Sequence, residues 1–185
     1  MTVKLIEAAQ QGDLSAYEEL IYTYRGTVER FAYQCGADYD DVPDISQEVF
    51  IRLYRFLHQF QRDRFTTWLY KVTLNTTRDH YRKETQETRK EKRLHEKGAL
   101  PGQTSEDTFL QSEADRELHL QIQKLDEKYR VPLVLYYFQE CSYSEIATIL
   151  SLTLGTVKIR IHRAKDLLRT AFEEQEAKLS GHTSL

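Results

Sequence analysis

The sequence predicts an all-α protein of two small helical domains joined by a flexible linker, the second domain ending in a helix-turn-helix. Three observations favour this fold class. The 185 residues include only seven glycines and three prolines, which is few for a turn-rich sheet protein. No segment sustains the alternation that predicts a strand, whereas apolar residues recur every three or four positions in many segments. Near the C-terminus two short helical patterns flank a tight turn, which is typical of a helix-turn-helix.

The first domain is predicted over residues 1–83 as four helices separated by capping signals. Asp13 is a suitable N-cap for the second helix, because its carboxylate can accept hydrogen bonds from amides of the first turn. Gly36 is expected to end that helix, and Asp41 with Pro43 in the first turn opens the third. The helices are expected at about residues 2–11, 14–34, 41–60 and 65–83.

The second domain is predicted over residues 113–175, after a linker at 84–112. In the linker the helical periodicity fades, and Pro101 with its neighbouring glycines disfavours a helix. Its first part, up to residue 93, is nearly all charged or polar, and a helical start of the linker is the alternative. Asp126 is expected to cap the second helix of this domain. The helices are expected at about residues 113–124, 126–139, 143–150 and 154–172. The polar residues from 173 onward are expected to fray, with 176–185 as the tail.

The composition favours a cytoplasmic protein without catalytic chemistry. No apolar run approaches the roughly 18 residues of a membrane span, and the N-terminus lacks the apolar core of a signal peptide. Cys35 and Cys141 are isolated, so we expect two small buried side chains in a reducing compartment, with a redox switch as the alternative. The six histidines are scattered, and none pairs with a Cys, Ser or acidic residue at a motif spacing. We therefore expect no enzyme activity, no cofactor and no metal site.

The net charge of −3 conceals a segregation of charge along the chain. Residues 1–61 carry a net charge of −5, residues 62–100 of +5, residues 101–150 of −5 and residues 151–185 of +2. Two separate basic segments are what contact with nucleic-acid phosphates requires. The acidic segments suit surfaces that meet basic partners, or are simply solvated faces.

The last predicted helix carries a basic face opposite an apolar stripe. The stripe, which is expected to be buried, consists of Val157, Ile161, Ala164 and Leu168. Cations on the flanks of the opposite face suit two phosphate backbones, and its centre suits base edges in the major groove. The residues expected to contact DNA are Gly155, Thr156, Lys158, Ile159, Arg160, His162, Arg163 and Lys165. A solvated basic face is the alternative, and the preceding Ser-Glu-Ile-Ala brace favours DNA.

The helix at 65–83 presents an aromatic ring, an amide and three cations on one face. These residues are Trp68, Lys71, Asn75, Arg78 and Arg82. A ring for stacking, an amide for base edges and cations for phosphates are typical of a single-strand DNA track. The alternative is that Trp68 belongs to the core and the cations are solvated. For Trp68 alone core packing is the preferred interpretation, whereas the cations as a set favour DNA.

The third predicted helix has an outer side with the features of a protein interface. Its expected core stripe is Ile45, Val49, Leu53 and Phe56. An exposed isoleucine among charged side chains is a mark of an interface. The outer side consists of Asp44, Gln47, Glu48, Ile51 and Arg55. The acidic residues before and within this helix lack the ligand order and turn glycine of a calcium loop, so capping is preferred over metal binding.

Five stretches of the chain form a recognisable set. They are Asp44-Ile-Ser-Gln-Glu-Val-Phe, Phe65-Thr-Thr-Trp-Leu-Tyr-Lys-Val-Thr-Leu-Asn, Leu125-Asp-Glu-Lys-Tyr-Arg, Tyr143-Ser-Glu-Ile-Ala and Gly155-Thr-Val-Lys-Ile-Arg-Ile-His-Arg-Ala. In this order, and across a variable linker, they resemble bacterial RNA polymerase sigma factors of the extracytoplasmic-function (ECF) subgroup of the sigma-70 family. The resemblance covers about residues 5–83 and 113–172.

The resemblance implies a sigma factor that binds core RNA polymerase, directs it to specific promoters and helps to open the −10 element. The first domain would bind the clamp helices of polymerase. Asp44, Gln47 and Glu48 match the polymerase-facing surface of the family, and Ile51 and Arg55 share that side. The expected partners are core polymerase, promoter DNA and an anti-sigma factor, which in this subgroup is often membrane-anchored. The free chain is expected to be monomeric.

The resemblance also assigns DNA contacts in both domains. The segment from Phe60 to Arg64, which includes Arg62, matches the loop that holds a flipped-out base of the non-template strand. Asn75 matches a helix residue that lines the same pocket, and flipping costs a few kcal/mol, so a shaped pocket gives selectivity. The second domain would read the −35 element with residues 155–165 and dock on the polymerase flap, while the linker threads near the RNA exit path.

Two positions depart from the family pattern. Ile159 stands where the family often has a small polar residue, and an isoleucine can pack on a thymine methyl but cannot hydrogen-bond a base. Thr153 stands where a proline is frequent. The chief alternative is a stand-alone dimeric helix-turn-helix regulator with a palindromic site, although the sequence offers no obvious dimerisation helix.

Overall fold

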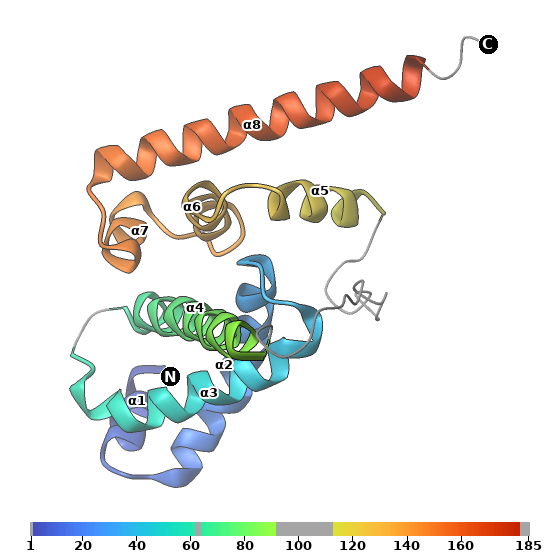
Figure 1. The fold of residues 1–185 in the computed structure, drawn as a ribbon. Helices are drawn as coiled ribbons and strands as arrows, with labels where there is room; N and C mark the ends of the chain where they lie inside the picture. The colour runs from blue at the N-terminus through green and yellow to red at the C-terminus, as the bar shows by residue number, and fades with distance from the viewer. Residues whose placement is uncertain (1, 62–63, 92–112, 182–185) are drawn as a thin grey trace. The chain divides into compact units, whose positions relative to one another are not determined.

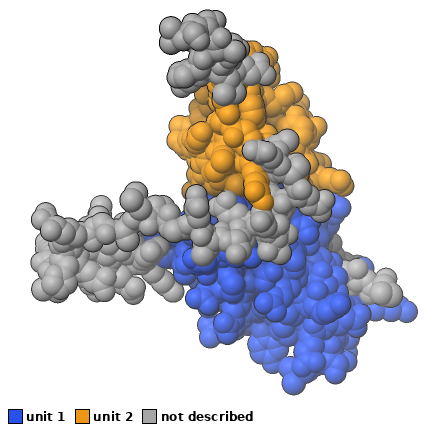
Figure 2. All heavy atoms as spheres, turned by 90° about the vertical axis from the view of Figure 1, so that its right-hand side faces the viewer, with its two compact units in different colours: residues 1–106 blue, residues 107–185 orange. Residues whose placement is uncertain are grey.

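The structure is a computed structural model of the 185-residue chain, and it describes residues 2–61, 64–91 and 113–181. Within these ranges all regular secondary structure is helical, so the predicted all-α class is confirmed (Figure 1). The chain forms two compact units, residues 1–106 and residues 107–185, which Figure 2 colours separately. No helix of the described residues is both long and apolar enough to cross a membrane.

Unit 1 is a bundle in which one long helix packs against three others. Its helices are α1 (Thr2–Gln10), α2 (Leu14–Gln34), α3 (Val42–Phe56) and α4 (Phe65–Glu91). Helix α2 contacts α1, α3 and α4, and α3 also packs on α4. Short 3₁₀ turns at Tyr39–Asp41 and Leu57–Gln59 lie directly before and after α3.

The ends of α2 follow the capping signals of the sequence. The Asp13 carboxylate accepts a hydrogen bond from the backbone N–H of Ala16 at 3.1 Å, which confirms the predicted N-cap. Gly12 has a φ of 92° and Gly36 a φ of 106°. Glycine adopts this left-handed region without steric cost, so the two residues turn the chain sharply at either end of the helix.

The core of unit 1 confirms most of the α3 stripe but not its last member. Ile45, Val49 and Leu53 are buried, whereas Phe56 is 47% exposed. The prediction for Phe56 is wrong because α3 ends there: the backbone changes to a 3₁₀ turn, which carries Leu57 into the core at 3% exposure instead.

Unit 2 packs three helices against one long helix. Its helices are α5 (Glu113–Gln123), α6 (Glu127–Tyr137), α7 (Tyr143–Leu150) and α8 (Leu154–Gly181). Helix α8 contacts α5, α6 and α7, which bury Val157, Ile161 and Ala164 as predicted. Leu168, the last member of the predicted stripe, is only partly buried. Asp126 caps α6 by accepting from the N–H of Lys128 at 3.0 Å.

Two helices extend further than the sequence predicts. Helix α4 continues to Glu91, so residues 84–91 of the predicted linker are helical, and α8 continues to Gly181 rather than ending at about residue 172. Both extensions are rich in Lys, Glu, Gln and Arg and contain no proline. These residues favour a helix once a preceding packed segment has nucleated it. The rest of the predicted linker, residues 92–112, lies outside the described residues.

Candidate functional site

The outer face of α8 combines cations with one large apolar side chain. Lys158, His162, Arg163 and Lys165 are exposed on this helix. Ile159 lies among them and is 71% exposed, whereas its neighbour Ile161 is 3% exposed on the opposite, packed side. Of the other predicted contacts, Gly155 is exposed, and Thr156 and Arg160 are partly buried. The structure therefore presents the whole predicted set at or near one surface of α8.

The turn before α8 is fixed by its own side chains. The Thr153 hydroxyl accepts from the backbone N–H of Thr156 at 3.2 Å, and the two threonine hydroxyl oxygens lie 2.8 Å apart. Thr153 therefore caps the first turn of α8. The Thr156 hydroxyl is already engaged in this cap, which leaves it less able to bond a base or a phosphate than the sequence implied.

Helix α7 is locked in the orientation that supports α8. Ser142 and Glu145 form a reciprocal capping box: the Ser142 hydroxyl accepts from the N–H of Glu145, and the Glu145 carboxylate accepts from the N–H of Ser142. The Tyr143 ring stacks on Tyr136 with centroids 5.0 Å apart. The Lys158 ammonium lies 5.9 Å from the centre of the Tyr143 ring, so a cation–π contact holds it beside α7.

An acidic residue moderates the positive charge further along α8. Asp166 accepts from Arg169 at 2.9 Å and lies 3.5 Å from the His162 ring nitrogen. Both pairs join residues three or four apart on one helix, a spacing that brings side chains together on the helix surface. The positive charge of this face of α8 is therefore concentrated in the first turns of the helix, near Lys158 and Arg163.

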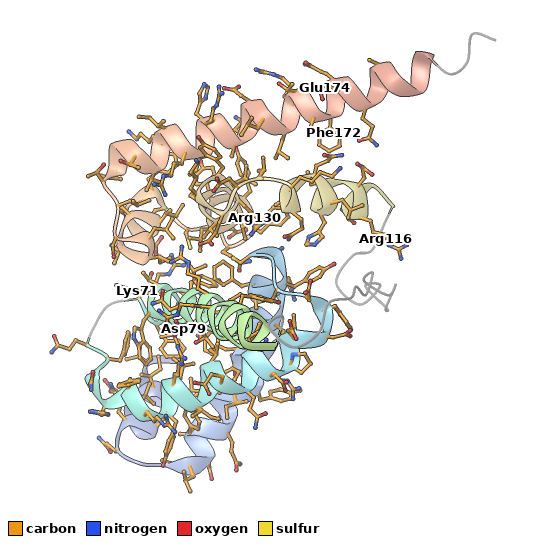
Figure 3. All side chains as sticks on the ribbon, viewed as in Figure 1. Lys71, Asp79, Arg116, Arg130, Phe172 and Glu174 are labelled. Atoms are coloured by element: carbon orange, nitrogen blue, oxygen red, sulfur yellow. The ribbon has the colours of Figure 1, made fainter. Side chains whose placement is uncertain are left out.

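The outer face of α4 carries the second predicted set. Lys71, Asn75, Arg78 and Arg82 are all exposed on it, and Figure 3 labels Lys71 and Asp79 on this helix. Arg82 lies 3.1 Å from Asp79, so part of its charge is neutralised. Arg62 lies outside the described residues.

Three aromatic rings gather where α4 begins. Phe60 lies 5.3 Å from Trp68 and 5.6 Å from Phe65, measured between ring centroids, and Phe65 lies 6.0 Å from Trp68. Trp68 packs in this cluster but is only partly buried. Its position is therefore intermediate between the core packing and the DNA contact that the sequence left open. The cluster holds Phe60 against α4, so the structure brings these two predicted residues together.

A residue of α1 that sequence reasoning missed fixes the same region. The Gln10 side-chain amide donates hydrogen bonds to the carbonyl oxygens of Leu57, at 2.9 Å, and Phe60, at 2.8 Å. Gln10 also lines a cavity of about 1010 Å³ together with Phe60 and Arg64. No local sequence pattern reveals this contact, because the partners are 47 and 50 residues away.

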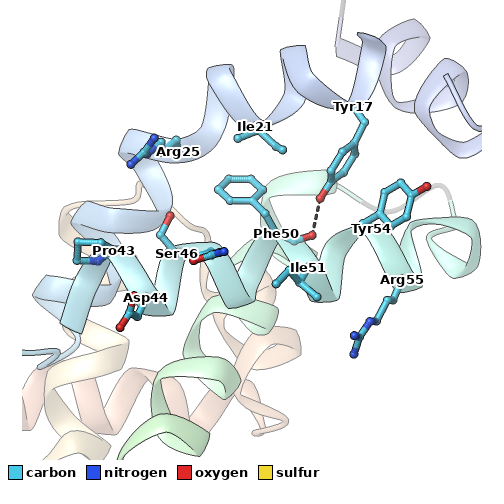
Figure 4. Close-up of a pocket in the computed structure, with 11 residues that line it drawn as sticks. Tyr17, Ile21, Arg25, Pro43, Asp44, Ser46, Phe50, Ile51, Tyr54 and Arg55 are labelled. Carbon is cyan, nitrogen blue, oxygen red and sulfur yellow. Dashed lines mark hydrogen bonds between the residues drawn. The ribbon is translucent and has the colours of Figure 1, made fainter. Parts of the chain in front are cut away.

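The outer side of α3 forms one wall of a groove. The groove has a volume of about 700 Å³, and Asp44, Gln47, Ile51 and Arg55 line it on the α3 side. On the α2 side it is lined by Tyr17, Ile21 and Arg25, which sequence reasoning missed (Figure 4). Their spacing of four residues on α2 is a helical-face signal that could have identified them.

A hydrogen bond across the groove couples its two walls. The Tyr17 hydroxyl donates to the carbonyl oxygen of Phe50, and its ring meets Tyr54 with centroids 5.1 Å apart (Figure 4). Burial raises the pKa of Tyr17 to about 12, so the hydroxyl stays protonated and remains a donor at neutral pH. The groove therefore has a preformed apolar floor and a charged rim.

A chain of ion pairs joins α3 to α4. Arg52 lies 2.9 Å from Glu48 on its own helix and 2.9 Å from Asp79 on α4. Asp79 in turn holds Arg82. The chain thus connects Glu48, predicted to face polymerase, with Arg82, predicted to face DNA.

The acidic residues near the start of α3 have structural partners. The Tyr81 hydroxyl of α4 donates to Asp41 at 2.9 Å and accepts from the backbone N–H of Asp38 at 2.7 Å. Within the described ranges, no three His, Cys, Asp or Glu side chains are placed to hold one metal ion. Cys35 and Cys141 are buried thiols, one in each unit.

Comparisons with known proteins identify the family. The family model described as Sigma-70 region 2 matches residues 20–87, and that described as Sigma-70, region 4 matches residues 115–168. The chain is 33% identical over 182 residues to the ECF RNA polymerase sigma factor SigW of Bacillus subtilis, covering 91% of this chain and 95% of that protein. This chain belongs to the ECF sigma factors.

Further relatives of this ECF sigma factor agree along nearly the whole chain. The RNA polymerase sigma-H factor of Pseudomonas aeruginosa is 32% identical over 183 residues, covering 92% of this chain and 93% of that one. The solved structure of CnrH in complex with the cytosolic domain of CnrY matches with a TM-score of 0.68 at 26% identity, covering 92% of this chain and 96% of that one. The matches to both sigma-70 regions and to a full-length ECF sigma factor confirm the prediction of a promoter-directing sigma factor over a stand-alone regulator. The family is regulatory rather than catalytic.

Proposed function

We propose that this ECF sigma factor divides promoter recognition between its two units. The first, over residues 1–83, binds core polymerase and opens the −10 element. The second, over residues 113–175, reads the −35 element. The observation that carries the proposal is that each of two separate compact units presents its own cationic helix face, on α4 and on α8.

The −35 element is contacted by α8. Ile159 and Arg163 lie toward the base edges, and Lys158, Arg160 and Lys165 lie toward the phosphates on either side. The support is that Lys158, Ile159, Arg163 and Lys165 are exposed and Arg160 is partly exposed, opposite a packed stripe, on a helix that contacts α7. A helix braced in this way can enter the major groove without losing its core contacts.

The −10 element is opened on α4 and the aromatic cluster of Phe60, Phe65 and Trp68. Lys71, Arg78 and Arg82 attract the phosphates of the non-template strand, and Asn75 offers an amide to a base edge. Arg64, which lines the same cavity as Phe60, contributes charge there, and Arg62 is proposed from the sequence as a further DNA contact. Stacking platforms flanked by cations are the common solution for binding single-stranded DNA.

Core polymerase binds in the groove between α2 and α3. An apolar contact at Ile51 with a rim of Asp44, Gln47 and Arg55 suits an amphipathic helix. Glu48 does not line the groove and is held by Arg52 instead, so we propose it as a peripheral contact. Helix-in-groove recognition combines apolar anchors with charged edges in this way. The flap of polymerase is proposed as the second contact, through the −35-reading unit.

The remaining properties follow from this role. The chain acts in the cytoplasm, where the polymerase and the chromosome are, and the free chain is monomeric. It is not an enzyme and needs no cofactor. Its activity is held in check by an anti-sigma factor, which can be membrane-anchored.

Run-off transcription tests the proposal. Fragmented genomic DNA of the source organism is transcribed by bacterial core polymerase with and without the full chain. New transcripts whose start sites share upstream −35 and −10 motifs are expected only with the chain present. If an active core polymerase and the folded, monomeric chain give no new transcripts, the proposed function is overturned.

A further inference from the structure

Ile159 is the least expected side chain on the surface of unit 2. Among the described residues of that unit it is the most exposed large apolar side chain, at 71% against 50% for Leu120 and Leu154. It lies on the outer face of α8, one helical turn from the cation Arg163. An isoleucine in this position gains nothing from packing and exposes apolar surface to water.

Gly155, one turn before Ile159, is also unexplained by the fold. A Cβ added there would meet nothing within 4 Å, so no neighbour in the chain requires the glycine. The residue lies in the first turn of α8 and does not have a positive φ, so its backbone conformation does not require a glycine either. Gly155 and Ile159 are four residues apart and therefore share one helix face. Both features make sense if a partner approaches α8 closely along this strip.

The charges around the strip favour DNA as that partner. Lys158 is held on one flank by the Tyr143 ring, and Arg163 continues the strip. A protein partner of matching shape would need acidic groups around an apolar anchor. DNA supplies phosphates on both sides of its major groove and, within the groove, one apolar group: the C5 methyl of thymine.

We propose that Ile159 determines specificity by packing against the C5 methyl of one thymine in the −35 element, with Gly155 leaving room for the adjoining DNA strand. The inference rests on the proposed −35 role of α8 and adds the chemical group that is read. Ile159 discriminates by apolar contact, which separates T·A from A·T and from both G·C orientations at that base pair. 5-Methylcytosine carries the same methyl group and is accepted in the same contact.

A chemical double-mutant cycle tests this contact. The polymerase holoenzyme containing the full chain is bound to a promoter defined by run-off transcription, and each −35 thymine is replaced singly by uracil, which lacks only the methyl group. Wild-type binding should weaken about fourfold at one position, since burying a CH₂-sized group contributes about 0.8 kcal/mol and 1.4 kcal/mol is tenfold. With Ile159→Ala, the same uracil should have no effect.

Two control variants sharpen the result. Ile159→Val keeps a branched apolar side chain and should retain most of the sensitivity to the methyl group. Leu154→Ala removes another exposed apolar side chain of α8 and should leave the fourfold uracil effect intact. Both sites are exposed, so circular dichroism should show unchanged folding. Replacing the uracil by thymine must restore binding in the wild type.

Each other outcome has a definite meaning. An equal uracil effect in the wild type and in Ile159→Ala overturns the assignment, as does the absence of any methyl-sensitive thymine. An Ile159→Ala variant that weakens binding to all DNA sequences alike indicates contact with polymerase and also overturns it. Loss of all −35 dependence in the wild type would instead refute the proposed function of α8.

Discussion

The Gln10 side-chain amide lies 2.8 Å from the carbonyl oxygen of Phe60, which ties the end of α1 to a residue 50 positions later. The same amide nitrogen also bonds the carbonyl of Leu57. Both carbonyls belong to the segment in which the chain leaves α3 before it enters α4. Because Phe60 packs against Trp68, the position of Gln10 determines how the proposed −10 surface is assembled.

Replacing Gln10 by glutamate should destabilise unit 1. The carboxylate has nearly the same shape but cannot donate, so two carbonyls lose their donor and face a negative charge. We expect the free energy of unfolding to fall by about 1–3 kcal/mol. Trp68 is the only tryptophan of the chain, so urea denaturation followed by its fluorescence reports on unit 1 alone.

Two companion variants separate the hydrogen bonds from a general charge effect. Gln11→Glu adds the same charge at an exposed neighbouring position and should leave stability within about 0.5 kcal/mol of the wild type. Gln10→Lys restores a donor and should recover part of the loss. A Gln10→Glu variant as stable as the wild type would show that these hydrogen bonds contribute nothing.

Unit 2 should become less stable as the pH falls from 6.5 toward 4. Burial, assisted by the charge of Arg130, lowers the pKa of His119 from 6.5 to about 4. In this window the unfolded chain binds a proton that the folded unit does not. The contribution of neutral His119 to the free energy of unfolding is therefore fully present above pH 6.5 and is lost as the pH falls toward 4. The imidazole is only partly buried, so we expect a loss of about 1–2 kcal/mol rather than the full value of the shift.

Urea titrations at several pH values, followed by the amide resonances of α6 and α8, measure this loss. His119→Gln should flatten the pH dependence, because the amide does not titrate in this range. A slope that persists in His119→Gln would assign the pH dependence to another group.

Gly155→Ala should leave stability intact and weaken promoter binding. The added methyl meets nothing within 4 Å and lies in the exposed first turn of α8, so the free energy of unfolding should change by less than about 0.5 kcal/mol. The same methyl should weaken −35-dependent binding by occupying space that the DNA approaches. Amide-detected urea titration and holoenzyme binding to a −35 promoter measure the two effects. Equal or improved promoter binding would remove Gly155 from the DNA contact.

Ile51→Glu should weaken the affinity for core polymerase by about tenfold or more, because a charge would replace an apolar contact on the groove floor. Ile51 is 39% exposed, so the free chain should tolerate the change. Tyr22→Glu is the matched control, since Tyr22 is 89% exposed on α2 and does not line the groove. Fluorescence anisotropy with labelled chain measures both affinities, and equal losses would argue against the groove.

The sequence predicts features that depend on local chemistry. The caps at Asp13 and Asp126 are confirmed, as are three of the four residues of the α8 stripe, because each depends on residues within one or two helical turns. The ends of α4 and α8 are wrong by eight or nine residues, since charged helix formers and a charged linker have the same composition. Leu57 is buried in the core in place of Phe56, because the change from an α-helix to a 3₁₀ turn alters which side chain faces inward.

Contacts between distant segments could not be predicted. Gln10 is an ordinary polar residue at the end of a helix until the fold brings Leu57 and Phe60 to it. The groove is similar: α3 shows one wall in its periodicity, but Tyr17 faces it only because α2 packs beside α3. Which surfaces are near each other is set by tertiary packing, which single-sequence periodicity does not encode.

The division of labour between the two units is tested most directly by permanganate and DNase footprinting of one promoter with two variants. Asn75→Ala should keep the protection at −35 but lose the permanganate reactivity of melted −10 thymines. Arg163→Ala should lose −35 protection, with promoter affinity reduced by about 1–3 kcal/mol, and should regain open complexes on a template with a premelted −10 bubble. The two-surface account is contradicted if both folded variants lose both signals equally. It is also contradicted if Asn75→Ala forms no more open complex on the premelted template than on duplex DNA.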